Sequence, residues 1–146
     1  MGILHFTDLQ NDVTYIVWDG VITWDDWLKH AGELKADPGW ALTSRFIADL
    51  QTVSDTSSIS EQQIDMALEV VGADPAVLSR KRGAVVAREE FRRANKFGDL
   101  IERFGATSVV FNHLDTACIF LGLNPAETLR TLEQLRAEIR SHNDVS

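Results

Sequence analysis

Short apolar runs that alternate with helical patterns are the feature that most constrains the fold of this chain. Each run is rich in β-branched and aromatic residues and is shorter than a typical helix. The runs span residues 13–19, 45–50, 83–87 and 107–111. Amphipathic helical patterns separate the successive runs. Strands that are joined through single helices pair in parallel, so the order predicts an α/β domain with a mostly parallel sheet.

The N-terminal segment predicts a β-hairpin at one edge of this sheet. Residues 4–9 form a weak extended run, and Gln10-Asn11-Asp12 is typical of a turn before the strand 13–19. The chain has 146 residues, enough for one domain with its own core. We therefore expect one domain over residues 1–146, with a single-layer mixed sheet, an antiparallel hairpin edge and crossover helices.

Capping residues locate the expected helices. Thr23 caps the first helix, which ends at Asp37-Pro38-Gly39, and Ser60 forms a capping box with Gln63 at the start of the second. Between them, residues 51–59 form a polar loop. The later helices begin near Glu89, Asp115 and Asn124, and the last one buries Leu129, Leu132, Leu135 and Ile139 before the chain frays over residues 141–146.

Four motifs in this order resemble the STAS-like superfamily, the fold of bacterial anti-sigma-factor antagonists. They are Gly20-Val21-Ile22-Thr23, Asp37-Pro38-Gly39-Trp40, Ala48-Asp49-Leu50 followed by residues 54–58, and Val109-Val110-Phe111 followed by a helix that ends at Leu121-Gly122. The resemblance covers nearly the whole chain. It implies a STAS-like fold and is nearest to the uncharacterised bacterial branch of the superfamily.

The resemblance also implies a candidate for phosphorylation. In anti-sigma-factor antagonists a kinase phosphorylates one serine of an Asp-Ser-Ser-Gly loop, and Asp55-Thr56-Ser57-Ser58 is similar to that loop, with Ile59 in place of the glycine. Ser57 and Ser58 are therefore the phosphorylation candidates. The alternative is local: Ser and Asp are common in turns and at helix caps without any further role.

Composition favours some partner classes over others. The net charge of −8 disfavours nucleic acid and anionic membrane surfaces. No apolar stretch is long enough to span a bilayer, and no signal peptide is visible, so we expect a cytoplasmic protein. The single cysteine, Cys118, lies in an apolar segment and is expected to be a small buried side chain.

Two carboxylates fall at the predicted carboxyl end of the central strand, where ligands of parallel α/β sheets bind. Asp49 and Asp55 are thus candidate binding residues and, in one alternative, the residues of a metal-assisted enzyme. No histidine or further carboxylate accompanies them at metal-ligand spacing, so no metal and no cofactor is expected. His30, four residues after Asp26, predicts a surface pair on the first helix.

All four tryptophans lie in the first forty residues. Trp24, Trp27 and Trp40, together with Trp18, predict either an apolar pocket, a dimer surface or plain packing of the first helix on the sheet. The leading hypothesis is a non-enzymatic binding or regulatory domain that acts through protein–protein contacts, with a homodimer as one form. The alternatives are a small-molecule or lipid-binding domain with a tryptophan-lined pocket and the metal-assisted enzyme; no set of catalytic residues is recognisable.

Overall fold

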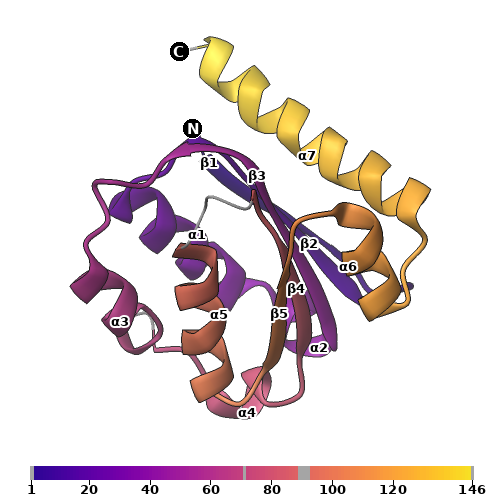
Figure 1. The fold of residues 1–146 in the computed structure, drawn as a ribbon, viewed down its shortest axis with the longest axis horizontal. Coiled ribbons are helices and arrows are strands. Elements are labelled where there is room, and N and C mark those ends of the chain that lie inside the picture. The colour runs from indigo at the N-terminus through magenta and orange to yellow at the C-terminus, as the bar shows by residue number, and fades with distance from the viewer. Residues whose placement is uncertain (1, 71, 89–92, 146) are drawn as a thin grey trace.

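The fold is built around one mixed sheet, which Figure 1 shows nearly edge-on. The computed structural model describes residues 2–70, 72–88 and 93–145. Within them the strands cross the sheet in chain order; β1 and β2 are antiparallel, and each later pair is parallel. The strands are β1 (Gly2–Asp8), β2 (Val13–Val21), β3 (Arg45–Asp55), β4 (Arg82–Val86) and β5 (Thr107–Phe111). The predicted α/β class, hairpin edge and parallel strands are confirmed.

Helices cover both faces of the sheet. The helices are α1 (Trp24–Ala36), α2 (Pro38–Leu42), α3 (Glu61–Val70), α4 (Pro75–Leu78), α5 (Arg93–Arg103), α6 (Leu114–Leu121) and α7 (Pro125–Val145). α1, α3 and α5 lie on one face, and α6 and α7 lie on the other (Figure 1). In β2, Ile16 and Trp18 pack in the core under α1, whereas Tyr15 and Val17 pack under α7. Because successive strand residues point to opposite faces, burial on both sides explains the continuous apolar run of β2.

β3 is longer than the sequence predicted. The strand continues from Leu50 to Asp55 instead of giving way to a loop at Gln51. The last residues of β2, which ends at Val21, pair with this extension, Gly20 with Val53 and Val21 with Asp55. Val53 is buried, but the polar residues around it conceal the strand pattern.

Two short helices begin at prolines. Asp37 accepts a hydrogen bond from Gly39 N at the start of α2, and Asp74 accepts one from Ala76 N at the start of α4. Asp-Pro therefore ends α1, as predicted, but also begins α2, because proline fits the first helical turn after an aspartate cap. Neither α2 nor α4 was predicted from the sequence.

The C-terminal helix differs from its prediction in two respects. α7 continues to Val145, so residues 141–145 are helical rather than frayed. Leu129 is 48% exposed, whereas the predicted core residues Leu132, Leu135 and Ile139 are buried. In the preceding helix, α6, His113 and not Asp115 occupies the N-cap position, without a side-chain cap bond, and Asp115 lies inside the first turn. The predicted helix start at Glu89 lies outside the described residues.

Candidate functional site

A cavity of about 230 Å³ lies between the sheet and the helices α1 to α5. Its floor comes from β2, β3 and β4, and its sides come from the helices that cover this face. The apolar residues that line it are Ile16, Trp18, Trp27, Ala31, Leu34, Trp40, Ala41, Phe46, Ala48, Leu50, Leu68, Ala73, Val77, Leu78, Val85 and Ile101. His30, Lys35 and Asp74 add the polar groups. The walls are therefore overwhelmingly apolar, as in small-molecule sites.

Three of the four tryptophans line this cavity. Trp18 comes from β2, Trp27 from α1 and Trp40 from α2. Trp24 does not line it but stacks on Trp27, with ring centroids 5.1 Å apart and an interplanar angle of 11°. The structure thus brings together Trp18, Trp27 and Trp40 of the predicted set and places Trp24 behind Trp27.

Side chains from separate elements hold Trp40 in place. The ring centroids of Trp40 and Phe46 lie 5.7 Å apart, and Lys81 Nζ lies 3.9 Å from the centroid of the Trp40 ring. Lys81 Nζ also donates hydrogen bonds to Trp40 O and Thr43 O. Burial, followed by the charge of Arg80, lowers the pKa of Lys81 to about 8. These contacts make Trp40 a fixed wall rather than a mobile flap.

Gly83 makes room for the Phe46 ring. A Cβ atom at that position would lie 2.0 Å from Phe46 Cζ, and Gly83 pairs with Phe46 across β3 and β4. Only a residue without a side chain lets the Phe46 ring lie flat on β4 and support Trp40. The position of an aromatic cavity wall therefore depends on a glycine in the neighbouring strand.

His30 lies on the cavity wall, which corrects its predicted place on the surface. It is 7% exposed, and its Nε2 lies 3.0 Å from Nδ1 of His5 in β1. Burial, followed by the charge of His5, lowers the pKa of His30 to about 3. His30 shares the face of α1 with Trp27 and Leu34, at i+3 and i+7 spacing, and this apolar stripe is the signal that predicts its burial.

The His5–His30 contact continues to Asp37. His5 Nε2 lies 2.9 Å from Asp37 Oδ2, which also accepts a hydrogen bond from Thr7 Oγ1. Although burial acts to raise it, the hydrogen bonds from Thr7 and His5 lower the pKa of the Asp37 carboxyl. β1, α1 and the start of α2 are thereby joined by one polar chain that ends at the cavity.

Asp49 and Asp55 do not form a joint site. Asp49 is buried, and its Oδ2 accepts a hydrogen bond from Arg136 Nη2 of α7 at 2.5 Å. Asp55 is exposed at the end of the same strand, about 20 Å further along at the usual rise of an extended chain. One ion cannot reach both carboxylates, and no described group of His, Cys, Asp and Glu side chains could hold a metal.

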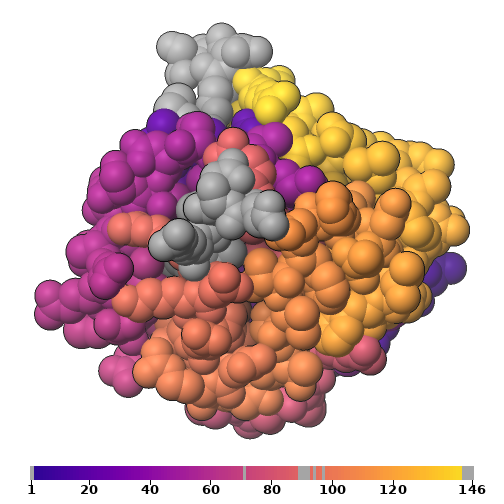
Figure 2. Space-filling view, viewed as in Figure 1, coloured from indigo at the N-terminus to yellow at the C-terminus, as the bar shows by residue number. Residues whose placement is uncertain are grey.

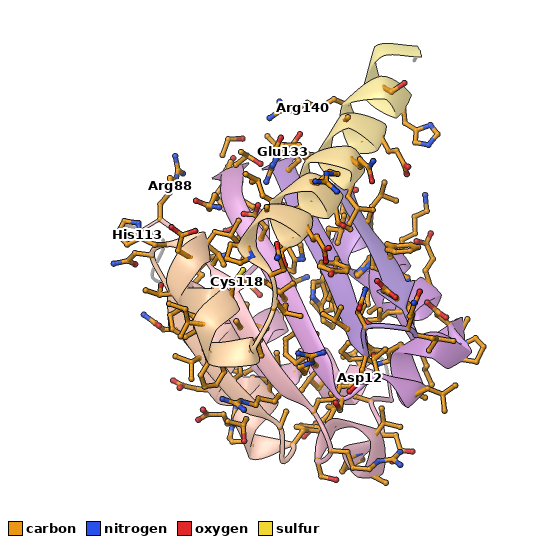
Figure 3. All side chains as sticks on the ribbon, turned by 90° about the vertical axis from the view of Figure 1, so that its right-hand side faces the viewer. Asp12, Arg88, His113, Cys118, Glu133 and Arg140 are labelled. Atoms are coloured by element: carbon orange, nitrogen blue, oxygen red, sulfur yellow. The ribbon has the colours of Figure 1, made fainter. Side chains whose placement is uncertain are left out.

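The buried Asp49–Arg136 pair belongs to the interface between the sheet and α7. Arg136 also donates to Glu133 Oε1 at 2.8 Å, and Arg140 donates to Asp19 in β2 at 3.1 Å. Figure 3 shows Glu133 and Arg140 on α7, on the side of the sheet opposite the cavity. The spacing of these cations along α7 matches two carboxylates on neighbouring strands.

Ser57 and Ser58 lie in the exposed connection between β3 and α3. Figure 2 shows the magenta segment that contains them at the surface, on the left of the view. Asp55 Oδ1 accepts a hydrogen bond from Ser57 N at 2.8 Å, and this bond lowers the pKa of the Asp55 carboxyl. Arg93 Nη1 donates to Thr56 O and Ile59 O, so a guanidinium lies against the backbone of this loop.

The capping box predicted for α3 is confirmed. Ser60 N donates to Gln63 Oε1 at 2.8 Å, and Gln63 N donates to Ser60 Oγ at 3.0 Å. Ser60 thus has a local role, whereas the side chains of Ser57 and Ser58 are left at the surface.

Cys118 is buried, and burial raises the pKa of its thiol, as expected for a packing residue. None of the helices, as far as they are described, is long and apolar enough to cross a membrane.

The sheet order and the helices on both faces define the SpoIIAA-like, or STAS-like, class of α/β fold. The chain is similar to the crystal structure of an uncharacterized protein of the DUF3478 family with a SpoIIAA-like fold, from Shewanella loihica PV-4. The two are 16% identical, with a TM-score of 0.55 over 82% of this chain and 93% of the other. No protein-family model and no curated protein matches the sequence. The predicted STAS-like resemblance is confirmed as a fold.

Proposed function

We propose that this chain is a binding domain that holds a small apolar molecule in its tryptophan-lined cavity, without chemical conversion. The observation that carries the proposal is the cavity of about 230 Å³ under α1 and α2. An apolar protein cavity of roughly 150 Å³ already stays dry and binds benzene. A larger apolar cavity favours a ligand larger than benzene, because each buried apolar group of the ligand leaves water.

The aromatic side chains that line the cavity are held in place, which supports selective binding of a ligand. Trp40 is fixed between Phe46 and Lys81, and Trp27 is fixed by its stack with Trp24. Rigid aromatic walls supply contact area at little cost in side-chain entropy. The cavity is thus largely formed before a ligand arrives, which is the usual state of a small-molecule site.

Titration with butylbenzene tests the proposal. We expect a change in tryptophan fluorescence that saturates, and a matching heat of binding in calorimetry. Ala31→Leu fills the cavity from α1 and should abolish binding, whereas Ala36→Leu, on the exposed end of the same helix and outside the cavity lining, should leave it intact. No saturable binding by the unaltered protein, or equal effects of the two variants, would overturn the proposal.

A second candidate function is regulation through a protein partner in the cytoplasm. It is favoured by Ser57 and Ser58, which are exposed near Asp55 in the loop whose backbone Arg93 contacts. A phosphate there would add negative charge near a guanidinium, which can order a loop and create or remove a docking surface. A homodimer is one form that such a partner contact can take.

Phosphate mapping tests this second function. The protein is incubated with a bacterial extract and ATP, and modified residues are located by mass spectrometry. Modification at Ser57 or Ser58, together with a change in partner capture or dimer content for Ser57→Asp or Ser58→Asp, is the expected result. An unmodified loop, and equal behaviour of these variants and Ser54→Asp on the exposed end of β3, would sink the idea.

The metal-assisted alternative has no geometric support. Asp49 is bonded to Arg136 on the α7 side of the sheet, and Asp55 lies at the far end of the strand. A buried carboxylate that already neutralises an arginine is a poor ligand for a cation, because the two positive charges would compete. The proposed function therefore rests on binding.

A further inference from the structure

The hydrogen-bond chain from Asp37 to His30 limits which ring nitrogens carry hydrogen. A carboxylate only accepts, so Asp37 Oδ2 receives the hydrogen on His5 Nε2. If the second ring nitrogen of His5, Nδ1, carries no hydrogen, it accepts from His30 Nε2 at 3.0 Å. His30 is neutral, since its pKa is lowered to about 3. In this arrangement its Nδ1 is a bare hydrogen-bond acceptor.

This acceptor has no hydrogen-bond partner among residues 2–70, 72–88 and 93–145. Among these residues, Ser108 Oγ is the side-chain atom that is both fully buried and without a hydrogen-bond partner. His30 Nδ1 does not share that state, so it is not fully enclosed by protein atoms. His30 lines the cavity while being 93% buried. A buried acceptor without a partner costs free energy until a donor reaches it.

We propose that the cavity takes an apolar molecule that carries one hydrogen-bond donor, a hydroxyl group, and that His30 Nδ1 accepts its hydrogen bond. The inference rests on the proposed function, since it assigns the chemistry of the ligand. The apolar body of the ligand contacts Trp27 and Trp40, and the hydroxyl orients it. His5 and Asp37 are positioning residues, because they keep the hydrogen of His30 on Nε2.

An acidic ligand is the main rival. Lys35 and Asp74 also line the cavity, so a fatty acid could direct its carboxylate to Lys35. His30 does not favour that ligand, because its bare Nδ1 and a carboxylate oxygen are both acceptors and repel each other. Octanoate is therefore included as a third probe beside a hydroxyl compound and its hydrocarbon analogue.

Nitrogen NMR of the unaltered protein tests the acceptor directly. In protein labelled with ¹⁵N-histidine, we expect hydrogen on His30 Nε2 and none on Nδ1. Addition of para-butylphenol should shift the Nδ1 resonance, and butylbenzene should move it far less. Hydrogen on Nδ1, or an Nδ1 resonance that ignores bound para-butylphenol, would overturn the inference without any variant having to fold.

Affinity ratios test the same contact by substitution. His30→Phe should weaken para-butylphenol relative to butylbenzene by about three- to tenfold, the usual worth of one hydrogen bond. Leu68→Val is the matched control, because it reshapes the apolar wall and should alter both probes alike.

The outcomes separate the two proposals. If neither probe binds, the proposed function fails and the inference fails with it. If both bind but His30→Phe leaves their ratio unchanged, or if octanoate binds more tightly than para-butylphenol, only the inference fails.

Discussion

Arg136 of α7 and Asp49 of β3 form a buried ion pair across 2.5 Å, with side chains 7% and 2% exposed. The pair joins the C-terminal helix to the middle of the sheet. The remaining donors of Arg136 reach Thr52 Oγ1 and Glu133 Oε1, and Asp49 Oδ1 accepts from Gln51 N. Such a pair contributes less through its net attraction than through the cost of leaving either charge buried alone.

The first prediction follows from that cost. Arg136→Met should lower the free energy of unfolding by about 3–5 kcal/mol, because Asp49 is left buried without its cation. Asp49→Asn in the same chain should restore part of the loss, because it removes the unpaired charge. Urea unfolding followed by circular dichroism measures both variants.

Arg140→Met is the control for this prediction. Arg140 also contacts a buried carboxylate, Asp19, but its own side chain is 58% exposed and water can replace it. We expect a clearly smaller loss than for Arg136→Met. Equal losses for the two variants, or no recovery with Asp49→Asn, would contradict the role assigned to the buried pair.

The second prediction concerns pH and His30. Its pKa falls from 6.5 to about 3 on folding, so below pH 6.5 the unfolded chain takes up a proton that the folded chain does not. The free energy of unfolding should therefore not be reduced by His30 above pH 6.5. Between pH 6.5 and pH 3 it should fall by up to about 1.4 kcal/mol per pH unit. The carboxyl groups with lowered pKa, such as Asp37, add to the loss only below their ordinary value of 3.8.

Denaturant unfolding at a series of pH values measures this slope. His30→Gln should flatten it from pH 6.5 to 3.8, above the range where carboxyl groups such as Asp37 contribute. His142→Gln, on the exposed part of α7, should leave it unchanged. An unchanged slope for His30→Gln would show that His30 is not held neutral by burial.

The third prediction concerns the support of Trp40. Gly83→Ala should destabilise the protein by about 1–3 kcal/mol, because its Cβ would overlap the Phe46 ring at 2.0 Å. The displaced ring should also weaken butylbenzene binding.

Gly32→Ala is the matched control, with nothing within 4 Å of the added Cβ on the exposed side of α1. Alanine is favoured over glycine inside a helix, so this variant should gain about 0.5–1 kcal/mol. If Gly83→Ala behaved like Gly32→Ala, the close packing of Phe46 on β4 would be wrong.

Local patterns in the sequence were sufficient to predict most of the architecture. Apolar runs locate the strands, and Thr23, Ser60 and Asn124 mark helix starts because a cap is decided by residues within one turn. β3 was predicted too short because Gln51 and Thr52 look like loop residues. The strand continues past them because Thr52, Val53 and Asp55 pair with the end of β2. The strand was extended by a tertiary contact, which overrides local preference.

The candidate site was predicted less completely, for the same reason. The tryptophans drew attention by type, but their spacing could not show that Trp18 and Trp40 would line one cavity while Trp24 stays behind Trp27. His5 and Asp37 lie 32 positions apart and meet only after β1 and α2 are placed. Asp49 and Arg136 lie 87 positions apart, so their pairing has no local signal at all.

Binding of a small apolar molecule in the cavity under α1 and α2 should be visible in the four indole N–H resonances of the tryptophans. On addition of butylbenzene we expect saturable shifts for Trp18, Trp27 and Trp40, which line the cavity, and a smaller shift for Trp24, which lies behind Trp27. Resonances that stay in place at saturating butylbenzene, or a shift confined to Trp24, would contradict it.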